Sequence, residues 1–267
     1  MPDAAFFDLD KTLIEGSSGV TFARVAYRAG MIDRRALLGD LRAGLRFRLH
    51  GSTDEASEAI RPRTLDAIAG TPVRQLQRLG AEVLTGVLPR VYPQMIAEAY
   101  AHQDAGREVY IVTAASHEMA EMLAHVLALD GGIGTRSRVR DGVYTGEPEG
   151  PFTYRDGKAE AIRAVASRRG IDLGASYAYS DSESDLPMLG LVDNPIAVNP
   201  DAALERIARE RGWRIMRFDK LARRLRIAAA AGAIALVGGG GGYVGGRLRR
   251  RRRGPRPIAG RRRTPQE

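Results

Sequence analysis

Two aspartates end the first apolar stretch of the chain. Residues 4–7 read AAFF, and Asp8 and Asp10 follow with one leucine between them. Residues two apart on an extended chain point to the same side, so these two carboxylates lie close together. Strands disfavour aspartate, and two like charges so close are costly unless a cation or a proton offsets them. The pair therefore predicts a site with a bound cation or proton at the end of a strand.

Four more polar residues lie at the ends or starts of later predicted elements, namely Thr113, Lys158, Asp181 and Asp185. Thr113 lies near the end of the β-branched run REVYIVTAAS, and Lys158 near the start of the predicted helix DGKAEAIRAVASRRG. The two aspartates follow the apolar residues of SYAYSDSESD. In a doubly wound sheet, the chemistry collects at the carboxyl ends of the strands. We therefore expect these residues to converge on the first aspartate pair.

These residue types suit phosphoryl chemistry. Carboxylate oxygens suit Mg²⁺, which takes few protein ligands and completes its octahedron with water and phosphate oxygens. One aspartate can attack phosphorus to form an aspartyl-phosphate, and a second, two residues on, can protonate the leaving oxygen and later activate water if its pKa is raised. Thr113 offers a hydroxyl and nearby backbone N–H groups to phosphoryl oxygens, and Lys158 offers a positive charge.

The first half of the chain is predicted to be helical after its first strand. From about Gly16 to Gln103, apolar residues recur at three- and four-residue spacing. This pattern predicts helices over residues 21–30, 34–51, 54–70, 72–88 and 93–106.

Strands and helices alternate in the second half. We expect strands over residues 107–116, 176–185, 195–199 and 213–218, and helices over 116–131, 156–170 and 200–212. Asp141-Gly142 suits the tight turn of a hairpin over residues 137–147. The alternation predicts a mainly parallel sheet covered on both faces. The predicted fold class is therefore α/β: a doubly wound core (residues 1–15 and 104–218) interrupted by a helical cap (residues 16–103).

Composition excludes several classes of site. The chain of 267 residues contains no cysteine, which rules out disulfides, zinc–thiolate sites and cysteine nucleophiles. No P-loop pattern occurs, which argues against a nucleoside-triphosphate site. No signal-peptide pattern occurs at the N-terminus, because Asp8 interrupts the first strand after a few apolar residues. We therefore expect a cytoplasmic catalytic body.

The order of the motifs resembles a known family. DLDKTL, then VTAAS, GKAEAI and YSDSESDLPML follow one another over roughly residues 4–218, and this set resembles the haloacid dehalogenase superfamily. The long helical insert after the first motif is similar to that of its phosphoserine-phosphatase-like branch, subfamily IB. The resemblance implies a Rossmann-like core with an inserted helical cap of the C1 type, and hydrolysis of a small phosphomonoester.

The resemblance also implies a role for each motif residue. Asp8 would be the nucleophile and Asp10 the general acid/base, while Thr113 and Lys158 would bind and stabilise the phosphoryl group. Thr12 and Ala114, in the same motifs, would contribute to substrate binding. Mg²⁺ would be held by Asp8 and Asp181, by the backbone carbonyl of Asp10, and with Asp185 in support. Two alternatives stay open: a phosphotransferase of the same fold, and an adaptor of that fold tethered to a membrane or to nucleic acid.

One position departs from the phosphoserine-phosphatase pattern. That branch has a glutamate shortly after the first motif, which contacts the ammonium group of the substrate, and Ser17 occupies the corresponding position here. We therefore keep the expected reaction and leave the phosphomonoester unspecified.

The C-terminal residues carry the net charge. Residues 247–267 contain ten arginines and one glutamate, which accounts for the formal net charge of +9 and leaves residues 1–246 at zero. Arginine-rich tails bind nucleic-acid phosphates without sequence choice. No aromatic residues lie between these arginines, so we expect no specific nucleic-acid partner.

An uncharged stretch precedes this basic tail. Residues 227–246 match a membrane span in length, but eight of the twenty are glycine, which disfavours a helix. Three interpretations stay open: a tail anchor with a cytoplasmic catalytic body, a segment at an anionic membrane surface assisted by the arginines, or a flexible linker (residues 219–246) before a disordered basic tail (residues 247–267).

Overall fold

The computed structural model describes residues 1–32, 65 and 68–218. Residues Met1–Arg217 form one compact unit, and residues Phe218–Glu267 form a second. The predicted helix over 34–51, most of the one over 54–70, and the tail segments 219–246 and 247–267 lie outside the described residues.

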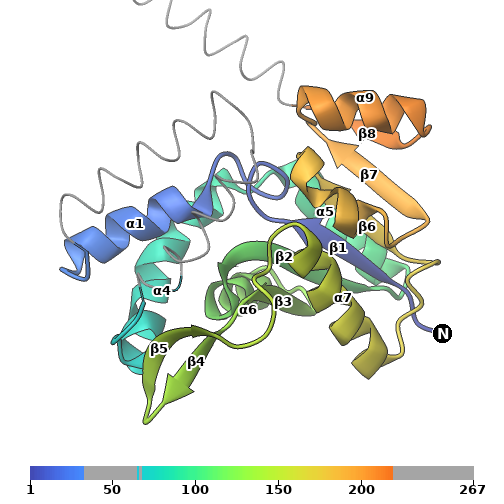
Figure 1. Cartoon of the computed structure of the whole chain (residues 1–267). Helices are drawn as coiled ribbons and strands as arrows, with labels where there is room; N and C mark the ends of the chain where they lie inside the picture. The colour runs from blue at the N-terminus through green and yellow to red at the C-terminus, as the bar shows by residue number, and fades with distance from the viewer. Residues whose placement is uncertain (33–64, 66–67, 219–267) are drawn as a thin grey trace, which may run out of the picture. The chain divides into compact units, whose positions relative to one another are not determined.

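A six-stranded parallel sheet forms the centre of the first unit (Figure 1). Its spatial order is β3 (Gly131–Thr135), β2 (Glu108–Ser116), β1 (Ala4–Asp8), β6 (Tyr177–Ser180), β7 (Asn194–Val198) and β8 (Arg214–Met216). The first strand is thus central, with Asp8 beside Val112 of β2 and Phe7 beside Tyr179 of β6. The predicted α/β class with a parallel sheet is confirmed.

Helices cover both faces of the sheet (Figure 1). They are α5 (Pro93–Asp104) and α6 (His117–Val126) on one face, and α7 (Asp156–Arg169), α8 (Leu186–Leu189) and α9 (Ala202–Glu210) on the other. Successive strand residues point to opposite faces. Accordingly Phe6 packs in the cluster that contains Ile162 of α7, while Phe7 stacks on Tyr179, whose hydroxyl lies 2.7 Å from His102 Nε2 of α5.

The strand β3 was not predicted. The expected helix over 116–131 ends at Val126, and the chain then enters the edge strand. Three of the five residues of β3 are glycine, which strands usually disfavour. A Cβ at Gly132 would lie 2.2 Å from the carbonyl carbon of Ala120, so the missing side chain is what lets α6 lie directly on the strand. Strand propensities describe single residues and do not include packing against a helix, so they could not predict β3.

The predicted hairpin over 137–147 is present as β4 (Ser137–Arg140) and β5 (Val143–Pro148). Asp141 and Gly142 both take positive φ values, 52° and 76°, as a two-residue hairpin turn requires. Beyond its own pairing, the hairpin bonds to the start of α4 and to the residues before it. Gly70 N–H donates to the Tyr144 carbonyl at 2.8 Å, and the N–H of Val73, the first residue of α4, donates to the Gly142 carbonyl at 2.9 Å. The hairpin thus holds part of the predicted cap against the core.

Apart from α5, which falls within the predicted cap (residues 16–103) but packs on the sheet, the described part of that cap consists chiefly of α1 (Ser18–Arg28) and α4 (Val73–Val87), which η1 (Leu88–Arg90) follows. The two helices approach closely, because a Cβ at Gly86 would lie 2.6 Å from Thr21 Cγ2. Both helices belong to the same compact unit as the sheet, and the division into core and cap stays a prediction. Among the described helices, none is long and apolar enough to cross a membrane, and the segment 227–246 lies outside them.

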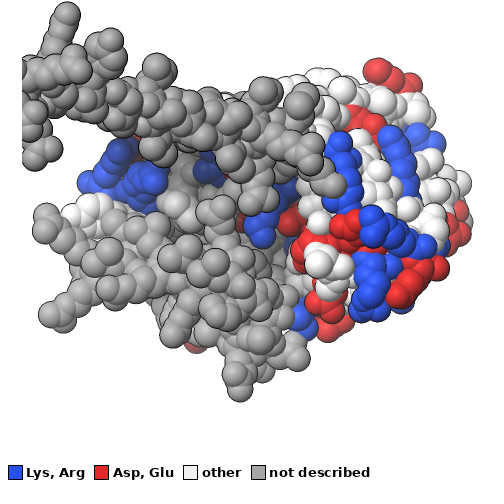
Figure 2. Space-filling model, turned by 90° about the horizontal axis from the view of Figure 1, so that it is seen from above, with Lys and Arg blue, Asp and Glu red and all other residues white. Residues whose placement is uncertain are grey.

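The surface of this unit is of mixed charge. Acidic and basic side chains lie side by side on the face shown in Figure 2, where it is not drawn in grey. Ion pairs such as Arg206–Glu210 at 3.2 Å and Arg214–Glu98 at 2.5 Å contribute to this pattern.

Candidate active site

Three of the predicted site residues form a buried ion-pair cluster. Lys158 Nζ lies 2.5 Å from Asp8 Oδ1 and 2.8 Å from Asp185 Oδ2. Asp8 ends the central strand, Lys158 lies in the first turn of α7, and Asp185 ends η2 (Glu183–Asp185). Residues 150 and 27 positions from Lys158 thus meet its ammonium group. The parallel sheet brings these segments together because its strand ends share one edge.

The cluster shifts the protonation of its members. Burial raises the pKa of Asp8 to about 7, although Lys158 lowers it, and Asp185 and Asp10 raise it further. Burial by itself lowers the pKa of Lys158, but Asp185 and Asp8 outweigh this effect and hold the pKa above its usual value. The lysine is therefore protonated at neutral pH, and Asp8 can accept a proton far more readily than an exposed aspartate.

Asp10 is held separately from this cluster. Its Oδ1 accepts a hydrogen bond from the Ser18 backbone N–H at 2.7 Å, and its Oδ2 accepts one from Ser17 Oγ at 3.2 Å. Ser18 is the first residue of α1, so the carboxylate lies at the N-terminus of that helix, where the helix dipole favours negative charge. Arg90 donates to the Ser17 carbonyl at 2.9 Å and to Thr21 Oγ1 at 2.9 Å, which fixes this turn.

Asp181 lies next to the cluster and fits a metal ion. Burial, and then the nearby Asp8 carboxylate, raise the pKa of Asp181 well above its usual range. Lys11 Nζ lies 3.8 Å from Asp181 Oδ2. A cation between the buried carboxylates of Asp8 and Asp181 would favour the ionised form of both. Carboxylate oxygens are hard ligands, which suit Mg²⁺.

The four predicted metal ligands differ in what else they contact. Among the described residues, no group of three or more His, Asp or Glu side chains is placed to hold a metal ion. The Asp185 carboxylate is bonded to Lys158 and to Ser180 Oγ, the latter at 2.7 Å. Asp8 and Asp181 are then the side chains best suited to a Mg²⁺ ion that keeps most of its water ligands, and all four assignments stay predictions.

The predicted phosphate-binding residues lie at the ends of the same strands. Thr113 is buried and follows Val112, the neighbour of Asp8 in the sheet. Its Oγ1 accepts a hydrogen bond from the Ala115 backbone N–H at 3.2 Å, while the carbonyl of Ala114 accepts one from Thr135. Thr12 is fully buried in the turn after β1, and among the described residues its Oγ1 has no hydrogen-bond partner. The role of Thr12 in substrate binding stays a prediction.

Several contacts in the site were not predicted from the sequence. Ser180 bonds Asp185, Lys11 pairs with Asp181, and Ser17 and Ser18 hold Asp10. The three serines lie within eight positions of the aspartate that each contacts, and Lys11, which pairs with the distant Asp181, directly follows Asp10. The sequence carries the signal, since polar residues crowd around both aspartate pairs, but it does not tell which of them point inward.

Comparison with known proteins agrees with this arrangement. The family model for haloacid dehalogenase-like hydrolases matches residues 5–190. Phosphoserine phosphatase SerB1 of Mycobacterium tuberculosis is 39% identical over 243 residues, which cover 87% of this chain and 79% of that protein. A histidinol-phosphatase of Neisseria meningitidis is 30% identical over 223 residues, covering 82% of this chain and 100% of the other.

A solved structure shares the fold. A substrate-bound phosphoserine phosphatase superposes with a TM-score of 0.60 at 18% identity, covering 85% of this chain and 98% of that one. The family match includes β1 from Ala5 on, the strands β2, β3 and β6, the buried lysine and all four aspartates. This chain therefore belongs to the haloacid dehalogenase-like hydrolase family, as its four ordered motifs predicted.

Proposed function

We propose that this protein is a Mg²⁺-dependent phosphomonoester hydrolase that works through an aspartyl-phosphate on Asp8. The observation that carries the proposal is the buried contact of Lys158 with both Asp8 and Asp185, at 2.5 and 2.8 Å. A lysine held in this way places a fixed positive charge beside the nucleophile. It can stabilise the negative charge that develops on the phosphoryl oxygens in the transition state, and the site does not have to rearrange to do so. The named activities of the two relatives, both phosphatases, support the same reaction.

The first step forms the covalent intermediate. A carboxylate oxygen of Asp8 attacks phosphorus, the bond from phosphorus to the ester oxygen breaks, and the leaving oxygen takes a proton from Asp10. Lys158 offsets the charge on the phosphoryl oxygens, and Thr113 with nearby backbone N–H groups donates hydrogen bonds to them. When bound, Mg²⁺ supplies positive charge to the phosphoryl oxygens and to the carboxylates of Asp8 and Asp181.

The second step releases phosphate. Asp10, now ionised, takes a proton from water as the water oxygen attacks phosphorus, and the bond between phosphorus and Asp8 breaks. The two hydrogen bonds from the start of α1 keep the Asp10 carboxylate turned away from the Lys158 cluster. Asp10 is thereby available for proton transfer while Asp8 serves as the nucleophile.

The substrate proposed is a small phosphorylated metabolite. The relatives are named for phosphoserine and histidinol phosphate, two small monoesters. Helices α1 and α4 of the predicted cap would close over such a molecule and exclude bulk water.

Phosphate release by the full chain tests the proposal. We would measure release from phosphoserine, sugar phosphates, glycerol phosphate, phosphocholine and lysophosphatidate, with and without Mg²⁺, for wild type and Asp8→Asn. We expect Mg²⁺-dependent turnover of at least one ester in wild type, and its loss by at least about a thousandfold in the variant, which lacks the nucleophile. Equal release by both proteins would overturn the assignment of Asp8, and transfer to an added alcohol would identify a phosphotransferase.

A further inference from the structure

The chain passes between the sheet and the helices α1 and α4 twice, once before α1 and once after α4. Backbone hydrogen bonds join these two crossings. Glu15 N–H donates to the Arg90 carbonyl at 2.7 Å, and Tyr92 N–H donates to the Leu13 carbonyl at 2.9 Å. The entry into α1 is therefore fixed directly to the exit from α4.

The side chain of Arg90 adds a second link across the two crossings. Arg90 is the last residue of η1, and its guanidinium reaches the first turn of α1. Nη2 donates to the Ser17 carbonyl at 2.9 Å, and Nη1 donates to Thr21 Oγ1 at 2.9 Å. These acceptors lie 73 and 69 positions away in the sequence. Because a guanidinium is planar and rigid, its two bonds fix the direction of this turn.

The turn that Arg90 holds is the same turn that holds Asp10. The Ser17 carbonyl and the Ser18 N–H belong to one peptide group, which is planar. Arg90 donates to the oxygen of this group, and its N–H donates to Asp10 Oδ1 at 2.7 Å. A hydrogen bond at the carbonyl also polarises the N–H of the same group, which strengthens the bond that it donates. Arg90 is thus linked to the Asp10 carboxylate through a single peptide group.

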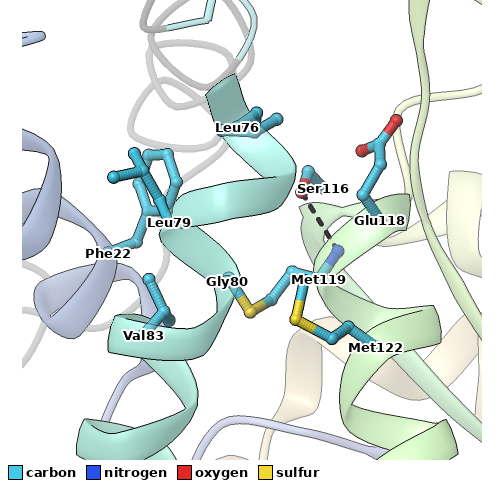
Figure 3. Close-up of a pocket in the computed structure, with 9 residues that line it drawn as sticks. All are labelled: Phe22, Leu76, Leu79, Gly80, Val83, Ser116, Glu118, Met119 and Met122. Carbon is cyan, nitrogen blue, oxygen red and sulfur yellow. Dashed lines mark hydrogen bonds between the residues drawn. The ribbon is translucent and has the colours of Figure 1, made fainter. Parts of the chain in front are cut away.

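Apolar packing holds α1 to α4 without Arg90. Side chains from α1, α4 and α6 line one small apolar space (Figure 3): Phe22, Leu76, Leu79, Val83, Met119 and Met122. Next to it, a Cβ at Gly86 of α4 would lie 2.6 Å from Thr21 Cγ2 of α1. Removing the arginine side chain should therefore leave the helices paired and chiefly release the Ser17–Ser18 peptide group.

We propose that Arg90 is a positioning residue for the proton transfers of Asp10. The inference rests on the proposed function, from which it takes the role of Asp10 as acid and base. Oδ1 is held by the peptide N–H at 2.7 Å, whereas Oδ2 faces the Ser17 hydroxyl at 3.2 Å, whose hydrogen can rotate away. Oδ2 is then the oxygen that carries the proton to the leaving group, and Arg90 fixes its direction.

The inference also assigns a role to Ser17. This is the position at which the sequence departs from the phosphoserine-phosphatase pattern. Here its hydroxyl contacts Asp10 Oδ2, and its carbonyl accepts the bond from Arg90. Ser17 therefore takes part in holding the acid/base rather than in contacting the substrate.

Esters with different leaving groups separate proton transfer from other effects. Nitrophenolate leaves phosphorus without a proton, whereas an alkoxide needs one. The alkyl ester is whichever of phosphoserine, glycerol phosphate and phosphocholine the wild type hydrolyses fastest with Mg²⁺. For Arg90→Met in the full chain, we expect kcat/KM for this ester to fall at least about tenfold, and kcat/KM for p-nitrophenyl phosphate to change less than about threefold.

The second step gives another readout with the aryl ester. Asp10 also takes the proton of the attacking water, so Arg90→Met should slow the breakdown of the aspartyl-phosphate. For p-nitrophenyl phosphate, kcat and KM should then fall together. Stopped-flow absorbance should show a burst of about one nitrophenolate per enzyme, followed by a steady state slower than that of wild type.

Two further variants complete the test. Ser17→Ala removes one hydroxyl and no packing, so it should lower kcat/KM for the alkyl ester a few-fold and spare the aryl ester, whatever the stability of Arg90→Met. Arg28 is the matched control, because it also joins α1 to α4, through Glu82 at 3.3 Å, but at the far end of α1 from Asp10. Arg28→Met should leave both esters unchanged.

Two results would contradict the inference. Equal losses of kcat/KM for the two esters in Arg90→Met and in Ser17→Ala would overturn it, since damage to the fold or to phosphate binding affects both esters alike. Unchanged kcat/KM for the alkyl ester in both variants would overturn it as well. A wild type that releases no phosphate from any ester would instead overturn the proposed function, and the inference would fall with it.

Discussion

The residue at which most of the site's electrostatics meet is Lys158. Its ammonium group is almost fully buried between two carboxylates. Removing one partner of a buried ion-pair cluster is costly, because it leaves the remaining charges without compensation. In contrast, Lys11 pairs with Asp181 at 3.8 Å while its own side chain is 44% exposed, and such pairs contribute little.

This contrast leads to a prediction for stability. Without Mg²⁺, Lys158→Met should lower the free energy of unfolding by about 3–5 kcal/mol at pH 8, while Lys11→Met should lower it by less than about 1 kcal/mol. Urea unfolding in the presence of a chelator measures both. A loss in the Lys158 variant no larger than that in the Lys11 variant would show that the cluster is not held by the lysine.

The loss of stability in Lys158→Met should also depend on pH, and its direction can be predicted. The pKa of Asp8 is raised to about 7 from an ordinary value of 3.8, so between these values the folded state binds a proton that the unfolded state releases. Stability contributed by this proton is present at low pH and lost as pH rises towards the folded pKa. Lys158→Met removes the group that lowers the Asp8 pKa, so its deficit relative to wild type should be smaller at pH 5 than at pH 8. Equal deficits at the two pH values would contradict this account.

At the scale of elements, the contact of α6 with β3 depends on a missing side chain. A methyl group at Gly132 would lie 2.2 Å from the Ala120 carbonyl carbon and 2.3 Å from Glu121 N. Backbone atoms of a helix cannot turn aside as a side chain can. The helix as a whole must move, and α6 begins directly after Ser116, three residues beyond Thr113 in the same strand.

Gly132→Ala should therefore destabilise the protein by about 3 kcal/mol, at the upper end of the usual cost of overpacking. Gly19→Ala in α1 is the matched control, because its Cβ would meet nothing closer than Ser17 Oγ at 3.5 Å. In a helix that exchange should be neutral or stabilise by up to about 1 kcal/mol. Thermal unfolding measures the stability of both variants. If Gly132→Ala were as stable as Gly19→Ala, α6 would be able to shift without cost.

At the scale of the whole molecule, the described core is complete within the first compact unit. Residues Met1–Arg217 contain the sheet, both sets of covering helices and every residue of the candidate site. The formal charge of +9, in contrast, comes from residues 247–267. The candidate chemistry and the basic tail are thus carried by different parts of the chain.

A shortened chain tests this separation. A protein ending at Phe218 should keep the melting temperature of the full chain within about 2 °C, because a domain with its own hydrophobic core folds alone. Its kcat/KM for a phosphomonoester should stay within about twofold. Scanning calorimetry and phosphate release provide these values. Loss of a cooperative transition would show that residues 219–267 contribute to the fold.

The sequence by itself determined the reaction class and most of the sheet. The aspartates at positions 8, 10, 181 and 185, with Thr113 and Lys158, are spaced so that strand ends must bring them together, and hydrophobic periodicity located β1, β2, β6 and β7. These features are local, so they can be read from a few neighbouring residues of the sequence. The strand β3 escaped prediction because its glycines serve the packing of α6, which lies outside any local window.

Only the tertiary structure decided which polar side chains meet. It turned Asp10 towards the start of α1 and Asp185 towards Lys158 and Ser180, although both aspartates belong to similar motifs. It also placed Glu118 near Tyr144, which is 26 positions away and on another element. Burial and the choice of hydrogen-bond partner are properties of the packed chain, because they depend on every element that packs around the same point. These contacts between distant elements cannot be read from the order of residues alone.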